Sequence, residues 1–226
     1  MGGPHIDALR ISPKFTSVDW CALDRDSKGD WVKAARIFKD RLDGRFLRYA
    51  TNCLRSPHSG FVVLSIDSLL LETLQQFREG IINGHGKSEL MVTTFLSGKR
   101  FQPEFSEDVR TAYYKDIRCG LLHQAEAKRM WLIRRDQNSI LRAWSDGQGY
   151  VIDVRLFHKA LRASMNDYLH ELTKPERGEL RANLWRKMNR ICSVRTERGA
   201  MYAVEMREDD VEAPNKSLHP TAFGGG

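Results

Sequence analysis

The sequence predicts an all-α fold in the broad sense: a mainly α helical bundle with a small antiparallel β-meander inserted into it. The chain has 226 residues, of which 41% are hydrophobic, and this is enough to build one core. Apolar residues recur at helical spacing through most of the chain, most densely in residues 60–81. Short strand-like runs cluster in residues 131–154. We therefore expect one helical domain over residues 29–206.

The two ends of the chain lack a periodic apolar face. Residues 1–28 contain glycine, proline and scattered polar residues, which predict an irregular N-terminal arm with a short strand near residues 15–20. Residues 207–226 combine charge, proline and glycine, which predict a disordered tail.

The first half of the domain is predicted to be helical. Residues 31–55 predict one or two helices, with a break near Asp43 and Gly44. The stretch FVVLSIDSLLLETLQQFREGI predicts a central helix, which Gly80 or Gly84 would end. The apolar stripe of this helix is widened towards burial on all sides by Val62, Leu64, Leu69 and Leu71.

The second half continues this pattern around the insertion. After a short helix in residues 85–101, Ser106 begins a helix that should run to residue 129. The runs at residues 131–135, 139–144 and 150–154 then predict the antiparallel meander, as an appendage beside the core. Two amphipathic helices follow at residues 157–172 and 180–191.

Composition narrows the classes of function. The sequence has neither a secretory signal nor an apolar run long enough to span a membrane, so we expect a soluble, cytoplasmic protein. Its four cysteines are far apart and form no metal-ligand cluster, so neither a metal nor a cofactor is predicted. A net charge of +7 and a pI near 9.3 favour an anionic partner such as nucleic acid.

One spacing carries the functional prediction. Arg118 and His123 are separated by four residues, within a helix that follows a long apolar helix. This pattern resembles the HEPN superfamily of helical-bundle proteins, and the resemblance spans residues 60–172 in the order of its elements. Arg78 and His85 fit a looser version with six intervening residues, but Gly80 and Gly84 lie between them, where the helix should end.

The resemblance implies a homodimer whose catalytic cleft lies between the subunits, and a metal-independent endoribonuclease of the toxin or anti-phage kind, with a possible antitoxin protein as partner. Helical geometry agrees, because five residues advance about 500° and leave Arg118 and His123 about 140° apart around one helix. A two-fold dimer would set two such helices side by side. An imidazole can transfer the proton of a ribose 2′-hydroxyl, while the arginine stabilises the charge on the phosphorane.

Neighbouring residues offer assistance and alternatives. Glu126, three residues after His123, is the third predicted catalytic residue because it could orient the imidazole, although a solvated glutamate fits the same position. Asp116 could reach across the dimer or pair with Lys115 or Arg110. Cys119 departs from the family, which commonly has a polar residue after the arginine. It also lies four residues from His123, the spacing of a thiolate–imidazole pair, so a Cys119-dependent enzyme is an alternative.

Basic and aromatic residues around the motif predict contact with RNA. Tyr113 and Tyr114 could stack on bases. The predicted RNA-binding cations are Lys128, Arg129, Arg134, Arg135 and Arg142. The principal rival is a non-catalytic helical module of the same superfamily that binds RNA or a partner protein through the same surface.

Overall fold

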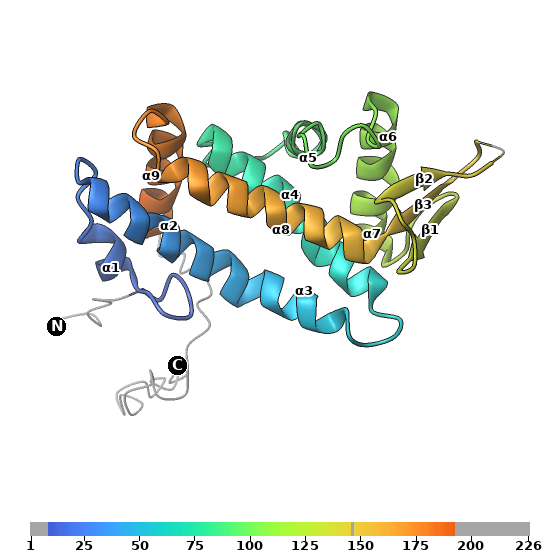
Figure 1. Ribbon diagram of the computed structural model, residues 1–226, viewed down its shortest axis with the longest axis horizontal. Helices are drawn as coiled ribbons and strands as arrows, with labels where there is room; N and C mark the ends of the chain where they lie inside the picture. The colour runs from blue at the N-terminus through green and yellow to red at the C-terminus, as the bar shows by residue number, and fades with distance from the viewer. Residues whose placement is uncertain (1–8, 146, 193–226) are drawn as a thin grey trace, which may run out of the picture.

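The central helix predicted at residues 60–80 organises the bundle. In the computed structural model, which describes residues 9–145 and 147–192, helix α4 runs from Gly60 to Glu79 and is ended by Gly80. Gly80 has a φ of 66°, the left-handed conformation that favours glycine after a helix. Helices α3, α5, α8 and α9 pack against α4, and α8 crosses in front of it in Figure 1.

The remaining helices confirm the mainly α class and most of the predicted order. They are α1 (Ser17–Cys21), α2 (Lys28–Leu42), α3 (Arg48–Cys53), α5 (Ser88–Leu96), α6 (Glu107–Ala112), α7 (Cys119–Gln124), α8 (Val154–Leu172) and α9 (Gly178–Cys192). Two π-helical turns, η1 (Asp43–Leu47) and η2 (Tyr113–Arg118), join α2 to α3 and α6 to α7. Helix α8 begins where the Asp153 carboxylate accepts the Leu156 N–H at 2.9 Å.

The helix expected at residues 31–55 does not break at Asp43 and Gly44. It continues through η1, where the Arg48 N–H bonds to the Asp43 carbonyl five residues earlier, the wider turn of a π-helix. A Cβ on Gly44 would lie 2.6 Å from Cγ of Pro13. The glycine therefore marks a close approach of the N-terminal segment to the helix.

The described part of the predicted N-terminal arm is largely irregular, but it contains one short helix and packs into the core. Ile11 and Trp20 are each 1% exposed and belong to the core. Helix α1 stands where a strand was expected, because Thr16 and Asp19 form a capping box in which the Thr16 N–H donates to Oδ2 of Asp19 at 2.8 Å. The indole N–H of Trp20 donates to Oδ1 of Asn189 at 2.8 Å, which ties the segment to α9.

The insertion forms a sheet of mixed direction, so the antiparallel meander was wrong in detail. Strands β1 (Trp131–Arg134), β2 (Leu141–Ala143) and β3 (Tyr150–Asp153) have the order β1-β3-β2, with β3 parallel to β1 and antiparallel to β2. Strand β3 takes the centre because three successive residues, Val151 to Asp153, are buried. The edge strands β1 and β2 keep exposed positions.

The sheet also contributes to the core, contrary to the expectation of an appendage. Trp131, Leu141 and Ile152 are buried in the same hydrophobic cluster as the helices. The Trp131 ring lies 6.1 Å from that of Tyr113, which stacks on Phe157 at 5.3 Å between ring centroids. Figure 1 shows the sheet at the end of the bundle where α8 begins.

A buried polar network joins α3, α4 and α8. His158 places Nδ1 2.8 Å from Oδ1 of Asp67 and Nε2 2.8 Å from the hydroxyl of Thr51. The Thr51 hydroxyl donates to the Leu47 carbonyl at 2.8 Å, so it accepts a hydrogen bond from the imidazole. Burial raises the pKa of Asp67, which hydrogen bonding to His158 opposes.

Three predictions concern the whole chain, of which the structure describes only residues 9–145 and 147–192. The predicted domain end at residue 206 and the tail at 207–226 lie outside the described residues. No helix within residues 9–145 and 147–192 is long and apolar enough to cross a membrane. In the same ranges, no three histidine, cysteine, aspartate or glutamate side chains gather as a metal site.

Candidate functional site

Two of the three predicted catalytic residues, Arg118 and His123, lie on the helix formed by α6, η2 and α7, called here the motif helix, which packs on α4 and α5. Within η2, the Cys119 N–H bonds to the Tyr114 carbonyl five residues earlier. Tyr113, Ile117 and Leu121 are buried in the core. Arg118 lies at the edge of this buried side, whereas His123 is exposed.

Arg118 is fixed by a carboxylate on the central helix. Its Nη2 donates to Oε2 of Glu72 at 2.8 Å, and each of the two side chains is 17% exposed. The Ser88 hydroxyl donates to the same oxygen at 2.6 Å. The Arg118 guanidinium also lies over the ring of Tyr114, with Cζ 5.6 Å from the centroid. The guanidinium is thus positioned where α4 meets the motif helix.

The hydrogen bonds of Glu72 continue to α9. Nε2 of Gln76 donates to Oε1 of Glu72 at 3.2 Å, and Oε1 of Gln76 accepts from Nζ of Lys187 at 2.7 Å. Lys187 also donates to the Ile81 carbonyl at 2.7 Å. Burial lowers the pKa of Lys187 to about 8, and the charge of Glu72 opposes this shift.

Lys187 should make the stability of the fold depend on pH. The folded chain binds fewer protons than the unfolded chain between the folded pKa of about 8 and the ordinary lysine pKa of about 10.4. The free energy of unfolding is therefore expected to rise across this window, by about 2 kcal/mol. Urea unfolding of the natural chain and of Lys187→Met at both ends of the window measures the rise, which the variant should lack. An equal rise in both proteins would contradict the assignment.

His123 lies near the end of α7 and is exposed to solvent. It makes no hydrogen bond or ion pair with any residue in the described ranges. Because Arg118 turns towards α4 while His123 lies about 140° further around the helix, one chain does not bring the two side chains together.

The structure does not place Glu126 on the motif helix. The predicted continuation to residue 129 was wrong, since α7 ends at Gln124 and Ala125 adopts a φ of 54°. Oε1 of Glu126 accepts the N–H of Ala127 at 3.2 Å. The spacing argument that placed Glu126 beside His123 requires an unbroken helix, so this geometric support is absent.

Asp116 has a structural role within one chain. It is buried, and Oδ2 accepts the indole N–H of Trp131 at 3.3 Å. Oδ1 lies 3.4 Å from Nε of Arg129. Its partners are therefore residues that follow the motif helix, and not Lys115 or Arg110 as the sequence suggested.

The thiol of Cys119 faces Tyr114 and not His123. The Tyr114 hydroxyl interacts with both Ser88 and Cys119, and burial raises the pKa of Tyr114. A π-helical turn brings residues five apart into proximity, which explains this contact. Within the described residues, the predicted thiolate–imidazole pair gains no hydrogen bond that would support it.

The predicted RNA-binding cations follow the motif helix in the chain, and they differ in how free they are to bind an external anion. They are Lys128, Arg129, Arg134, Arg135 and Arg142. Arg134 pairs with Asp136 at 2.8 Å and lowers the pKa of that carboxyl. Arg135 donates to the carbonyl of Ser56 at 2.7 Å. Arg142 is exposed, so it is better placed for an external partner than the paired arginines.

Sequence reasoning missed an exposed apolar surface on the central helix. Leu64 and Leu71 are buried as predicted, but Val62 and Leu69 are 51% and 41% exposed. Leu122, one residue before the motif histidine, is 47% exposed. We refer to Val62, Leu69 and Leu122 as the apolar strip.

Two residues of the apolar strip project near the ion pair between Arg118 and Glu72. Helical spacing places Leu69 about 60° from Glu72 around α4, and Leu122 about 40° from Arg118 around α7. Glu72 itself was missed because it lies 46 residues from Arg118 in the chain, where no local spacing signals the pair. Exposed leucines were missed because a leucine-rich helix reveals which of its sides is covered only once its neighbours are placed.

Comparison of the chain with protein-family models, with curated proteins and with solved structures finds no match in any of the three. The resemblance to the HEPN superfamily therefore rests on Arg118, His123 and the order of the helices, and it stays a prediction.

Proposed function

We propose that the protein is a metal-independent endoribonuclease of HEPN type that acts as a homodimer. The observation that carries this proposal is the setting of Arg118. Glu72 fixes its guanidinium, the apolar strip lies beside it, and a solvent-exposed His123 follows on the same helix.

Arg118 keeps a donor for a phosphate oxygen. The ion pair with Glu72 uses Nη2, and Nε is buried without a hydrogen-bond partner, whereas Nη1 makes no hydrogen bond with a described residue. Nη1 therefore keeps its donors for an anion while Nη2 holds the side chain in place.

A second copy of the chain would complete the site. Arg118 and His123 diverge on one helix, but a two-fold axis through the apolar strip would set the two α7 helices side by side. The same contact would cover Val62, Leu69 and Leu122, which are exposed in one chain.

The chemistry of this pairing follows from the groups present. One His123 accepts the proton of a ribose 2′-hydroxyl as the 2′-oxygen attacks phosphorus, and the His123 of the second copy donates a proton to the departing 5′-oxygen. Arg118 stabilises the charge on the phosphorane. The products are a 2′,3′-cyclic phosphate and a 5′-hydroxyl.

The proposal is tested by incubating the purified protein with single-stranded RNA in EDTA. We expect fragments with 2′,3′-cyclic phosphate and 5′-hydroxyl ends, and no cleavage of the same sequence with 2′-deoxyribose throughout. Cleavage of the deoxy strand at a similar rate, or products with 5′-phosphate ends, would refute the mechanism.

Charge introduced into the apolar strip should separate the dimer. Leu69→Arg is expected to weaken dimerisation by at least about tenfold, because the interface would bury an unpaired charge. Light scattering after size exclusion measures the mass, and the RNA cleavage rate should fall with the dimer fraction. Leu90→Arg, at an exposed leucine on α5 outside the strip, is the matched control. A dimer of unchanged affinity in Leu69→Arg would place the interface elsewhere.

The second candidate is a non-catalytic helical module that binds RNA or a partner protein through the same surface. It is favoured by the ion pair between Arg118 and Glu72, which already satisfies part of the guanidinium. This alternative predicts RNA binding without product. It also predicts that overproduction of the natural chain and overproduction of His123→Ala slow cell growth equally. A ribonuclease toxin restrained by an antitoxin would instead lose its toxicity in the variant.

A further inference from the structure

We propose that the seam between α3 and α8 binds the sugar–phosphate backbone of a single-stranded nucleic acid. We call it the basic seam and define it by Arg48, Arg55, Arg155, Lys159 and Arg162. Figure 1 shows α3 and α8 side by side on one face of the bundle. None of these residues belongs to the cations predicted from the sequence.

Hydrogen bonds to Thr51 fix the two helices against each other. The Thr51 hydroxyl lies 2.8 Å from Nε2 of His158 and accepts from Nη1 of Arg162 at 2.9 Å. On α3, Arg48 projects within about 60° of Thr51 around the helix axis, on the side away from buried Ala50, and Arg55 lies in the turn that follows the helix.

Helix α8, which faces α3 across the seam, also carries cations on its exposed side. Arg155 and Lys159 lie within about 60° of Arg162 around α8, again on the side away from the core. Arg48, Arg55, Arg155 and Lys159 are exposed, and Arg162 is half-buried. The exposed sides of both helices therefore carry positive charge.

Little negative charge offsets these cations. Arg162 pairs with Asp43 at 3.2 Å, and Arg155 lies 3.6 Å from the fully buried Asp153. Beneath the seam, Asp67 is paired with His158. Arg48, Arg55 and Lys159 form no ion pair with any residue in the ranges that the structure describes. Three positive charges are thus left for an external anion.

The spacing of these charges suits a phosphate backbone. Arg155 and Arg162 are about 10 Å apart along the axis of α8, and a stacked nucleic acid strand carries a phosphate about every 3.4 Å of rise. The seam can therefore neutralise about three consecutive phosphates.

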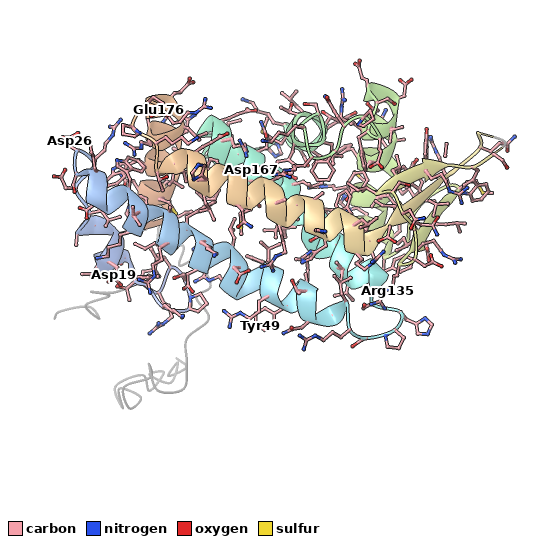
Figure 2. All side chains as sticks on the ribbon, in the orientation of Figure 1. Asp19, Asp26, Tyr49, Arg135, Asp167 and Glu176 are labelled. Carbon is pink, nitrogen blue, oxygen red and sulfur yellow. The ribbon has the colours of Figure 1, made fainter. Side chains whose placement is uncertain are left out.

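The surroundings of the seam favour nucleic acid over a protein or a membrane. A protein interface or a membrane contact needs exposed apolar anchors. The exposed large hydrophobic residue on α3 is Tyr49, and it points away from α8 (Figure 2). The polar residues beside the cations include Asn52 and Asn166, which donate and accept hydrogen bonds to a sugar–phosphate chain.

The basic seam is separate from the candidate catalytic site. The two sites face different sides of the central helix, since Asp67 lies under the seam, Glu72 holds Arg118, and these two residues are about 140° apart around α4. The seam would therefore guide a nucleic acid along the bundle whether or not the protein cleaves RNA.

The test measures binding without cleavage. Fluorescence anisotropy records the affinity for a labelled single strand of 2′-O-methyl RNA, which lacks the nucleophilic hydroxyl, over a range of salt concentrations. Arg48→Glu combined with Lys159→Glu is expected to weaken binding at least about tenfold and to reduce the salt slope by about 1.4, the value for two lost phosphate contacts.

The matched control changes the same net charge elsewhere. Lys33→Glu combined with Arg186→Glu alters one exposed lysine and one exposed arginine on α2 and α9, away from the seam. This variant should bind within about twofold of the natural chain. Equal weakening in both double variants would show only general attraction, and no binding by the natural chain would also overturn the proposal. The assay follows binding of a strand that cannot be cleaved, so failure of the ribonuclease proposal is distinguishable from failure of this one.

Discussion

Replacing His123 with alanine is expected to lower the rate of RNA cleavage in EDTA by about 10²–10⁴-fold, the range that a general acid or base contributes. The loss should be this large because His123 is exposed, lies next to the apolar strip and supplies the proton transfers of the proposed reaction. The measurement is a single-turnover rate with saturating protein, so that weaker RNA binding does not enter the result.

His85→Ala is the matched control for this variant. His85 is an exposed histidine that also follows an arginine, Arg78, at a spacing close to the motif. The helix of Arg78 ends before His85, as Gly80 predicted, and Arg78 instead donates to the Ser164 carbonyl at 3.3 Å. His85→Ala should therefore cleave at the natural rate. An unchanged rate in His123→Ala would remove the imidazole from the mechanism, whatever the control does.

The second large effect concerns stability. His158→Leu is expected to lower the free energy of unfolding by about 3–5 kcal/mol, because it leaves Asp67 buried without its partner. Oδ2 of Asp67 already lacks a hydrogen-bond partner among the described residues, so the carboxyl has no other group to turn to there. Urea unfolding followed by circular dichroism measures the change.

Two further variants separate the pair from its neighbours. His158→Leu combined with Asp67→Leu should recover most of the loss, since replacing both members of a buried pair removes the uncompensated charge. His170→Leu changes an exposed histidine on the same helix and should stay within about 0.5 kcal/mol of the natural chain. If His158→Leu were no more destabilising than His170→Leu, the buried network would not hold the fold.

The end of the central helix was predictable because one residue dictates the backbone there: Gly80 ends α4 by adopting a positive φ. The start of α8 was placed too late, at residue 157, because the cap that Asp153 provides directly after a strand was not recognised. The π-helical turns were not predictable in the same way. At Asp43 and Gly44 the composition looks like a break, and only the approach of Pro13 shows why a small residue is needed inside a continuous helix.

Non-local packing explains the other errors. Strand order in the sheet depends on which strand is covered on both faces, and the three short runs do not differ enough in composition to show it. Trp20 was predicted to lie in an irregular arm because the sequence does not show that its indole N–H donates to Asn189. At the candidate site, the sequence could propose Arg118 and His123 from their spacing, but not Glu72, because an ion pair between two helices leaves no periodic signal.

Removing one residue within η2 would close the π-helical turn into a regular α-helix. The wide turn takes up its extra residue locally, so Leu121 and the residues after it would keep their orientation relative to α6. Side chains inside the turn would instead shift by one position, and Asp116 would lose its alignment with Trp131. The length of this one turn thus decides which side chains η2 itself presents, while the two flanking helices keep their register.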